Sequence, residues 1–263
     1  MDLKLKNKIA LVTGASRGLG FATAHQLAAE GAIVVINSRN PESVRESARK
    51  ITEDTGSTCH ALPGDMTAPS FPQQLVDETI AICGGLDIVI ANAGGPPAGS
   101  FETFDDAAWQ YAFELQFMSQ VRLIRAALPA LHQSPAASVL TITSYSVKQP
   151  IANLVLSNSV RAATVGLTKS LALELGAEGI RFNSILPGWT ETERVYDLMS
   201  QRARANHTSV EEEIAKQTQD SPLGRMAQPQ EFANAAVFLL SPAASYITGV
   251  MLTVDGGMYK GTL

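Results

Sequence analysis

Short apolar runs that alternate with longer segments of helical period constrain the fold of this 263-residue chain more than any other feature. The runs contain apolar residues in succession rather than at every second position, which indicates strands buried on both faces. Strands of this kind occur in parallel sheets, and the β–α alternation predicts a doubly wound, Rossmann-type α/β fold in three layers. The predicted strands are residues 9–14, 33–38, 86–94, 138–144, 180–188 and 250–257, and the helical segments include 18–30 and 41–54.

The chain shows no linker and no internal repeat, so we expect one domain over residues 1–263. A single long segment at about 189–225 interrupts the alternation and is rich in charged and polar residues. Loops of this length are uncommon unless they have a function. The favoured interpretation is a lid over a substrate pocket, and the alternative is a surface insertion outside the site.

The composition argues against several classes of function. A net charge of −5 predicts no general attraction to nucleic acid or to an anionic membrane surface. No apolar run approaches the roughly 20 residues of a transmembrane helix. Cys59 and Cys83 are isolated and lack metal or CxxC spacing, which favours a reduced, cytoplasmic setting. No histidine pair has the spacing of metal ligands, so we expect no metal site.

The segment after the first predicted strand reads TGASRGLG, residues 13–20. Gly14, Gly18 and Gly20 permit a tight turn, a close approach of the backbone to a pyrophosphate and close packing of the next helix. The first N–H groups of that helix would face the anion. Placed between a buried strand and a helix, the motif predicts a dinucleotide-binding loop. Its other predicted cofactor-binding members are Ser16, Arg17 and Leu19.

The second predicted strand ends with the sequence VVINSRN and contains no acidic residue that could bind the free ribose 2′-hydroxyl of NAD. Ser38 closes the strand and Arg39 follows it, while Arg17 lies in the glycine loop. Two guanidinium groups suit a 2′-phosphate because each offers charged, bidentate donors. The sequence therefore favours NADP(H) over NAD(H), with no carboxylate to compete for the arginines. The alternative is that both are solvated surface residues.

Four motifs carry a resemblance to a known family: TGASRGLG, ANAGG at 91–95, LPGWTET at 186–192 and ITGVMLTVDGG at 247–257. Their order and spacing resemble those of the short-chain dehydrogenase/reductase family, nearly end to end, and most of all its β-ketoacyl carrier-protein reductase-like members. The resemblance implies a set of further cofactor contacts. These would be Asp65 and Met66 at the adenine, Asn92, Ala93 and Gly94 at a ribose, and Pro187, Gly188, Thr190 and Thr192 at the nicotinamide carboxamide.

The catalytic residues usual in that family are Asn, Ser, Tyr and Lys, and only the serine is present here. By the resemblance, Ser144 binds the substrate oxygen, whereas Ser157 occupies the tyrosine position, Arg161 the lysine position and Gln116 the asparagine position. A serine hydroxyl is far harder to ionise than a phenol, whose pKa is about 10, so Ser157 is a poor proton donor. Arg161 would still supply charge and hydrogen bonds at the nicotinamide ribose, although it cannot release a proton.

Two residues just after Ser144 are candidate replacements for the missing acid. Tyr145 and Lys148 both titrate and follow the strand end at the rim of the expected pocket. The alternative is a packing aromatic and a solvated cation. Three functions stay open: an NADP-dependent oxidoreductase acting on a ketone or alcohol with a modified proton relay, a catalytically impaired nucleotide-binding protein with a regulatory or scaffold role, and non-redox use of the cofactor. We favour the first.

The resemblance also implies a homo-oligomer, expected to be a tetramer, in which the helix at about 154–175 pairs with its two-fold mate. Ala162, Ala163 and Gly166 would permit close packing there, and the alternative is a core helix of a monomer. Apolar residues after the strand at 180–188 indicate a partly hydrophobic small molecule if they point inward, namely Trp189, Tyr196, Met199 and Met226.

Overall fold

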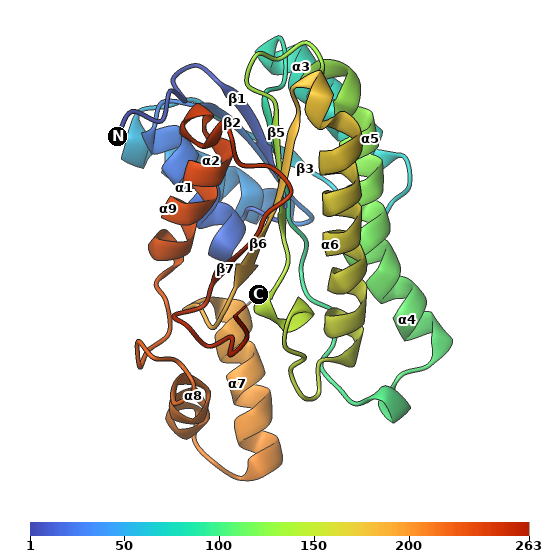
Figure 1. Ribbon diagram of the computed structural model, residues 1–263, viewed down its shortest axis with the longest axis vertical. Helices are drawn as coiled ribbons and strands as arrows, with labels where there is room; N and C mark the ends of the chain where they lie inside the picture. Colours follow the sequence, from blue (N-terminus) through green and yellow to red (C-terminus); the bar gives the residue numbers. More distant parts are fainter. Residues whose placement is uncertain (263) are drawn as a thin grey trace.

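A seven-stranded parallel sheet forms the centre of the computed structural model, which describes residues 1–262. The strand order is β3-β2-β1-β4-β5-β6-β7, and helices cover both faces (Figure 1). The predicted doubly wound α/β fold is confirmed. The strands are β1 (Ile9–Val12), β2 (Ile33–Ser38), β3 (Cys59–Pro63), β4 (Ile88–Ala91), β5 (Ser138–Ile142), β6 (Arg181–Pro187) and β7 (Met251–Val254).

The helices divide between the two faces of the sheet (Figure 1). One face packs against α1, α2 and α9, and the other against α3, α5 and α6. The helices are α1 (Gly18–Ala29), α2 (Pro41–Thr55), α3 (Phe71–Cys83), α4 (Asp106–Phe113), α5 (Ser119–Leu131), α6 (Val155–Leu175), α7 (Glu193–Asn206), α8 (Val210–Thr218) and α9 (Pro229–Leu240). A π-helical turn, Glu114–Met118, joins α4 to α5.

Strand β1 shows why the apolar runs lack alternation. Ala10 and Val12 lie in the core beside α1, α2 and α9, whereas Leu11 lies in the core on the opposite face. All three side chains are fully buried. A strand with a hydrophobic core on each side needs apolar residues at every position, and its parallel neighbours follow the same rule.

Strand β3 is absent from the sequence-based prediction. It lies at the edge of the sheet, and all five of its residues are only half-buried. A short edge strand that contains His60 and ends at Pro63 has neither the apolar run nor the alternation on which strand prediction depends.

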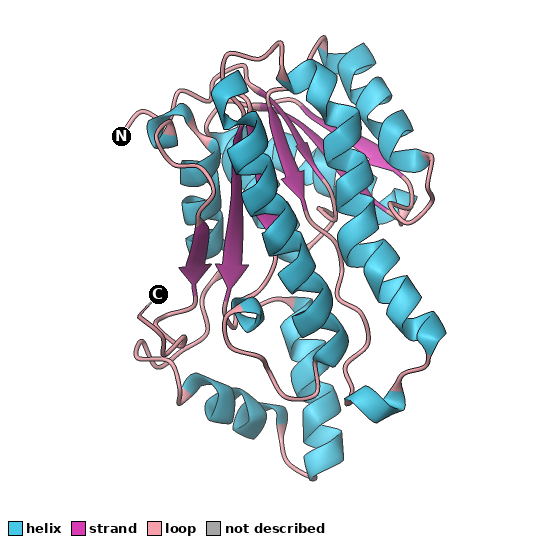
Figure 2. Ribbon diagram, turned by 45° about the vertical axis from the view of Figure 1, so that its right-hand side comes forward, coloured by secondary structure: helices cyan, strands magenta, loops and turns pink. Residues whose placement is uncertain are grey.

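The segment between β6 and α9 was expected to be a long loop, but it folds into the helices α7 and α8. Both lie beyond the carboxyl ends of the strands, the end toward which the arrows point (Figure 2). Thr192 caps the start of helix α7, and its hydroxyl accepts from the N–H of Val195. Helix α8 begins with a capping box, in which Ser209 and Glu212 each accept from the other's backbone N–H. These caps are sequence signals for two short helices.

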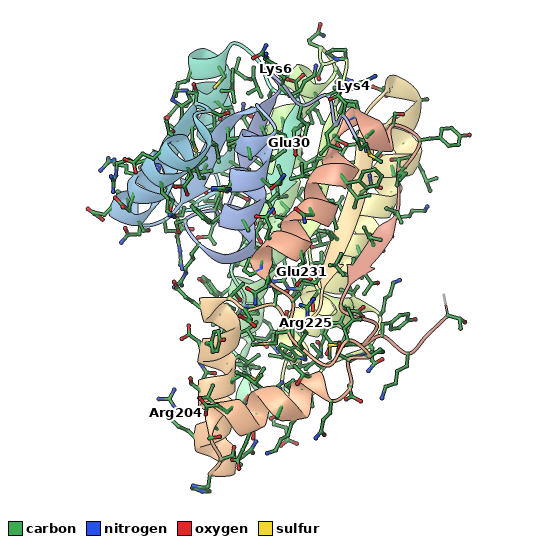
Figure 3. The ribbon with its side chains drawn as sticks, turned by 90° about the vertical axis from the view of Figure 1, so that its left-hand side faces the viewer. Lys4, Lys6, Glu30, Arg204, Arg225 and Glu231 are labelled. Carbon is green, nitrogen blue, oxygen red and sulfur yellow. The ribbon has the colours of Figure 1, made fainter. Side chains whose placement is uncertain are left out.

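Two ion pairs fix this helical segment, one at the junction of its two helices and one where it returns to α9. Glu213 on α8 is almost fully buried and accepts from Lys216 (2.7 Å), Thr208 (2.7 Å) and Asn206 (3.2 Å), which ties α8 to the end of α7. Where the chain returns to the body of the protein, Arg225 makes two 2.7 Å contacts with Glu231 on the first turn of α9 (Figure 3). No helix among residues 1–262 is both long and apolar enough to cross a membrane.

Candidate active site

Two adjoining cavities lie at the carboxyl end of the sheet, on either side of the point where the strand order reverses between β1 and β4. The inner cavity, about 450 Å³, reaches Ser144 and Ser157; the outer cavity, about 880 Å³, reaches Ser38 and Asp65. Open α/β sheets bind ligands at such a reversal point. The residues lining both cavities are Gly14, Arg17, Arg39, Asn92, Ala93, Gly94 and Glu193.

Most of the predicted site residues line one or both cavities. The inner cavity contains the predicted residues Gly18, Leu19, Ser144, Tyr145, Ser157, Arg161, Pro187, Gly188, Thr190 and Thr192, and the outer cavity contains Ser16, Ser38, Asp65 and Met66. Three predicted or candidate residues line neither cavity: Gly20, Gln116 and Lys148. The structure therefore brings together groups that lie up to 178 positions apart in the sequence, between Gly14 and Thr192.

The glycine loop forms a tight turn at the mouth of the cavities. Gly14 and Gly18 have φ of 59° and 60°, a region that side chains disfavour. Gly20 has a packing role, because a Cβ there would lie 2.4 Å from the carbonyl oxygen of Gly14. Asn92 fixes the turn from the end of β4: its Nδ2 donates to the carbonyl oxygen of Gly14 (3.0 Å), and Thr13 Oγ1 donates to its carbonyl oxygen (2.7 Å).

The cavities fit the predicted dinucleotide on two structural grounds. The left-handed turn at Gly14 and Gly18 leaves the backbone open to a phosphate at the N-terminus of α1. At the opposite end, Thr190 Oγ1 is buried and has no hydrogen-bond partner within residues 1–262, and Thr190 lines the inner cavity. Buried hydroxyls are normally paired, so this one is available to a polar ligand group such as a carboxamide.

The two arginines predicted at the 2′-phosphate are not equivalent. Arg39 is exposed and makes no hydrogen bond or ion pair with any described residue. Arg17 forms a short ion pair with Glu193, the first residue of α7. The expectation that no carboxylate competes at this position is therefore wrong. Glu193 lies 176 positions from Arg17 in the sequence, and no local pattern around β2 could have revealed it.

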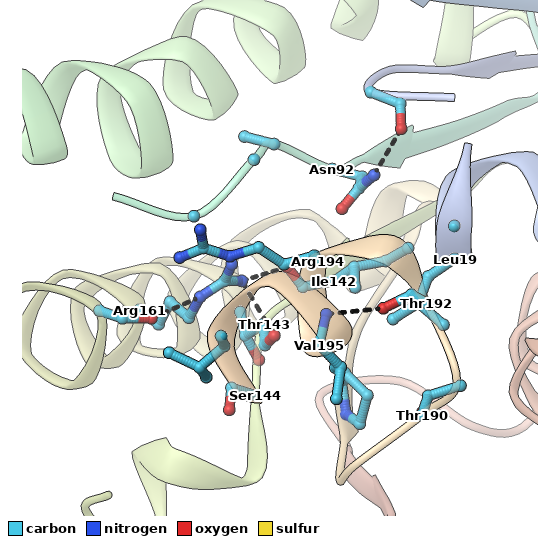
Figure 4. A pocket seen from close by; sticks show the side chains of 18 of the residues that line it. Leu19, Asn92, Ile142, Thr143, Ser144, Arg161, Thr190, Thr192, Arg194 and Val195 are labelled. Atoms are coloured by element: carbon cyan, nitrogen blue, oxygen red, sulfur yellow. Dashed lines mark hydrogen bonds between the residues drawn. The ribbon is translucent and has the colours of Figure 1, made fainter. Parts of the chain in front are cut away.

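Arg161 is held by a set of hydrogen bonds inside the inner cavity (Figure 4). Its Nη1 donates to the carbonyl oxygens of Ile142 (3.0 Å) and Thr143 (2.9 Å) at the end of β5, and its Nε donates to Ser157 Oγ (3.0 Å). With the Gln116 amide oriented so that its oxygen faces the guanidinium, that oxygen accepts from Nη2 (2.9 Å) and Nε (3.1 Å). Only one of the five N–H groups of Arg161 is then left for a ligand.

Arg161 keeps its charge in surroundings that disfavour it. Burial and, to a smaller extent, the nearby positive charge of Arg194 together lower the pKa of Arg161 to about 10. At neutral pH the guanidinium remains protonated. Arg194 itself reaches across the cavity mouth, where its Nη2 donates to the carbonyl oxygen of Pro96 (2.8 Å).

The two serine hydroxyls of the inner cavity share one hydrogen-bonding pattern. Ser144 Oγ accepts from the N–H of Ser146 (3.1 Å) in the turn after β5, and Ser157 Oγ accepts from Arg161 Nε (3.0 Å). Neither hydroxyl donates to a described residue. Each oxygen is therefore oriented and polarised by an N–H donor, while its own O–H can donate to a ligand.

The two candidate acids outside the family pattern lie in different surroundings. Tyr145 lines the inner cavity, and its ring packs edge-on against Trp189, with centroids 6.5 Å apart. Burial raises the pKa of Tyr145, with Arg202 acting in the opposite direction. Lys148 lies outside the lining, with its Nζ 5.1 Å from the centre of the Tyr259 ring. Of the two, only Tyr145 can reach a ligand in the cavity.

An apolar cluster closes the inner cavity on the side of α7. It contains Tyr145, Trp189, Leu198, Met199, Met226 and Met258. Trp189 lines the inner cavity directly, whereas Met199 and Met226 are buried in the cluster and line neither cavity. Tyr196 lies outside the cluster and is 42% exposed. Among the described residues, no group of three His, Cys, Asp or Glu side chains is arranged to hold a metal ion.

Residues 14–259 match the family described as enoyl-(acyl carrier protein) reductase. The chain is 33% identical to the 7alpha-hydroxysteroid dehydrogenase of Escherichia coli K12 over 258 residues, which cover 97% of this chain and 96% of that protein. A 7alpha-hydroxysteroid dehydrogenase structure with NADH and 7-oxo glycochenodeoxycholic acid superposes with a TM-score of 0.86 at 32% identity and covers 97% of this chain and 96% of that one.

Two further solved structures are similar along the whole chain. L-sorbose reductase from Gluconobacter frateurii, in complex with NADPH and L-sorbose, has a TM-score of 0.94 and 31% identity, and the match covers 99% of this chain and 100% of that one. An NADPH-bound short chain oxidoreductase from Pseudomonas aeruginosa PAO1, described as containing an atypical catalytic center, has a TM-score of 0.88 and 29% identity, and the match covers 98% and 100%.

Proposed function

The chain belongs to the short-chain dehydrogenase/reductase family of NAD(P)-dependent oxidoreductases, and we propose that it transfers a hydride between NADP(H) and a ketone or alcohol through an atypical proton relay. One observation carries this proposal: the glycine turn at Gly14 and Gly18 opens into a cavity that contains the free hydroxyls of Ser144 and Ser157. A cofactor bound at the turn would extend toward these hydroxyls.

The proposed roles of the residues follow from where they lie. Gly14, Gly18 and the start of α1 hold the pyrophosphate, and Asp65 with Met66 borders the adenine. Thr190, with its unpaired buried hydroxyl, binds the carboxamide. The bound nicotinamide supplies or takes up the hydride. Ser144 and Ser157 orient the substrate oxygen and donate hydrogen bonds to it, and Arg161 polarises Ser157.

The preference for NADP(H) rests on Arg39 and Arg17. Arg39 makes no bond to a described residue and borders both cavities, so it can bind a 2′-phosphate directly. Arg17 would exchange Glu193 for the phosphate, since an exposed ion pair is worth little. Two of the similar solved structures contain NADPH, whereas the 7alpha-hydroxysteroid dehydrogenase structure contains NADH.

A catalytically impaired, nucleotide-binding role is the second candidate. It is favoured by the hydrogen bonds of Arg161, because a guanidinium bonded to two main-chain carbonyls, Ser157 and Gln116 acts first as a structural group. In this interpretation the cofactor-binding part of the site is intact, whereas the residues at the catalytic positions bond to one another and to the main chain instead of to a substrate.

We also propose a cytoplasmic homotetramer. The outward face of α6 exposes Ala162, Ala163 and Gly166, and further along the same helix Leu173 is 75% exposed. Small exposed residues on a long helix allow a two-fold mate to approach closely. The edge strand β7 would supply a second contact.

The test combines binding with turnover. We expect fluorescence titration to give tighter binding of NADPH than of NADH, and a carbonyl panel to show NADPH oxidation. Tight binding without turnover of any acceptor would support the impaired, nucleotide-binding role, and the absence of binding would overturn both.

A further inference from the structure

From the donors and acids of the inner cavity we infer that the preferred acceptors are conjugated carbonyl compounds, the enones and quinones, rather than isolated ketones. The inference rests on the proposed function, since it requires hydride transfer at this site. It depends on three observations: two free hydroxyl donors, a shortage of proton-releasing groups, and walls of aromatic and aliphatic side chains.

Ser144 and Ser157 supply the donors. Each Oγ accepts one hydrogen bond, from Ser146 N–H and from Arg161 Nε respectively, and each O–H is left to point at an acceptor oxygen. The charge of Arg161 makes the Ser157 O–H a stronger donor. Preorganised donors of this kind stabilise negative charge that develops on an oxygen, and they do so without transferring a proton.

The same cavity has few groups that can release a proton near neutral pH. No lysine, histidine or cysteine lines it. Its cations are arginines, which do not act as acids. The two carboxylates that line it are Glu193, which is paired with Arg17, and Asp197, which is exposed. Tyr145 is the one phenol in the lining, and burial makes it a weaker acid than an ordinary tyrosine.

The chemistry of the acceptor decides whether the shortage of proton-releasing groups slows hydride transfer. When a hydride adds to an isolated ketone, the C=O π bond breaks and an alkoxide forms, whose conjugate acid is about as weak as water, with a pKa of ~15.7. When a hydride adds to the β-carbon of an enone, the C=C π electrons shift and the charge reaches the carbonyl oxygen as an enolate. A quinone gives a phenolate in the same way, with a pKa of about 10.

An enolate or phenolate can be held by hydrogen bonds and protonated later by water, so that acceptor, NADPH and one solvent proton give reduced acceptor and NADP⁺. An alkoxide is a far stronger base, and its formation without a general acid is slower by about 10²–10⁴-fold. A site with strong hydroxyl donors and weak acids is therefore suited to the conjugated class. The walls agree with this assignment, since Tyr145, Trp189, Ile151, Leu154 and Leu198 offer apolar and aromatic surface to a planar, unsaturated ring.

The experiment compares cyclohexanone, 2-cyclohexen-1-one and 1,4-benzoquinone with the full-length protein and NADPH, after subtraction of the rates without protein. We expect kcat/KM for the two conjugated acceptors to exceed that for cyclohexanone by at least about 10²-fold, the factor that a general acid typically supplies. With NADPH deuterated at the transferable position, the label from the enone reaction should appear on the β-carbon.

Variants test the two hydroxyls. Ser144→Ala and Ser157→Ala should each lower kcat/KM for the enone by about 10²-fold and leave the Kd of NADPH unchanged. Ser245→Ala, at an exposed serine outside both cavities, is the matched control and should change nothing. Turnover of cyclohexanone at the rate of the enone, or label on the carbonyl carbon, would overturn the inference and leave the proposed function standing. NADPH binding with no turnover of any of the three would overturn both.

Discussion

Arg161 donates a hydrogen bond from Nε to Ser157, one turn earlier on α6, while its terminal Nη1 donates to the carbonyl oxygens of Ile142 and Thr143 at the end of β5. The residue at the family's lysine position thus joins the helix to the sheet directly beside the cavity. Its charge reaches the cavity through the Ser157 hydroxyl.

Restoring the tyrosine–lysine pair that is usual in the family should raise the rate of ketone reduction. We expect Ser157→Tyr combined with Arg161→Lys to raise the reduction of isolated ketones by about 10²–10⁴-fold, the range of acid catalysis. A phenol without a nearby lysine lacks its pKa shift, and a lysine without the phenol has no proton to steer, so each single change should do little. Gln116→Asn should add a smaller factor. Steady-state rates with one ketone panel measure all four variants.

The competing assignment makes Tyr145 or Lys148 the native acid. In that case Tyr145→Phe or Lys148→Met would abolish the native activity, and the restored pair would add nothing. The position of Lys148 over the Tyr259 ring, away from the cavity lining, already argues against the lysine.

Cofactor preference should respond in opposite directions to two substitutions. Arg39→Ala should weaken NADPH binding by about 10-fold or more, since a hydrogen bond to a charged group contributes ~1.5–3 kcal/mol, and NADH binding should change little. Glu193→Gln should strengthen NADPH binding by up to about fivefold, because it releases Arg17 from an exposed pair worth ~1 kcal/mol or less. Fluorescence titrations with both cofactors give the four affinities. If Arg39→Ala weakened NADH binding as much as NADPH binding, the loss of affinity could not be attributed to the 2′-phosphate, which NADH lacks.

The stability of the α7–α8 segment should depend on pH through Glu213. Hydrogen bonds from Lys216, Thr208 and Asn206 lower the pKa of Glu213 from its ordinary 4.5 to about 2. The folded state therefore binds this proton less readily than the unfolded state. The contribution of ionised Glu213 is complete above pH 4.5 and is lost as the pH falls toward 2.

Urea unfolding at several pH values measures the effect. Glu213→Gln should lower the free energy of unfolding at neutral pH, and its difference from the unmodified protein should shrink between pH 4.5 and 2. Glu211→Gln, at an exposed position in the first turn of α8, is the control and should show no such convergence. A constant difference at every pH would assign the loss to packing rather than to ionisation.

Assembly should fail when charge is placed on the outward face of α6. Ala163→Glu brings two carboxylates together across the proposed two-fold axis, and we expect light scattering to show a smaller particle than the unmodified protein. Ala205→Glu, at an exposed position of α7, should leave the mass unchanged. If the unmodified protein has the mass of one chain at micromolar concentration, the proposed tetramer is wrong.

The parts of the fold that could be predicted are those with strong local signals. The buried strands β1, β2, β4, β5 and β6 pack on both faces and therefore read as apolar runs. Strand β3 gave no such signal because its residues, Cys59–Pro63, form no run of apolar side chains, whereas the edge strand β7, equally half-buried, has such a run at Met251–Val254. Helices α7 and α8 carry capping residues at Thr192 and Ser209 and short apolar faces that pack into the cluster beside the cavity, but the charged and polar residues that dominate the segment mask these signals.

The residues of the site also fall into a group that the sequence predicts and a group that it does not. The motif spacing predicts the glycine turn, Asn92 and Ser144 as parts of the site, and all of them lie at the cavities. The pairing of Glu193 with Arg17 could not be predicted, because it joins residues 176 positions apart in the sequence. The spacing of Ser157 and Arg161 also could not reveal that the guanidinium bonds to main-chain carbonyls, because every residue has a carbonyl group whatever its side chain.

The bonds of Arg161 also bear on how such a site can change by mutation. Ser157→Tyr alone would place a ring where Arg161 now has a hydroxyl acceptor, and Arg161→Lys alone would leave one ammonium to serve two carbonyls, a serine and an amide. Residues with shared partners show non-additive effects. Each single step between this site and a tyrosine–lysine site thus passes through a less well-bonded intermediate. A lineage that acquired the Ser157–Arg161 arrangement would tend to keep it, whatever reaction it serves.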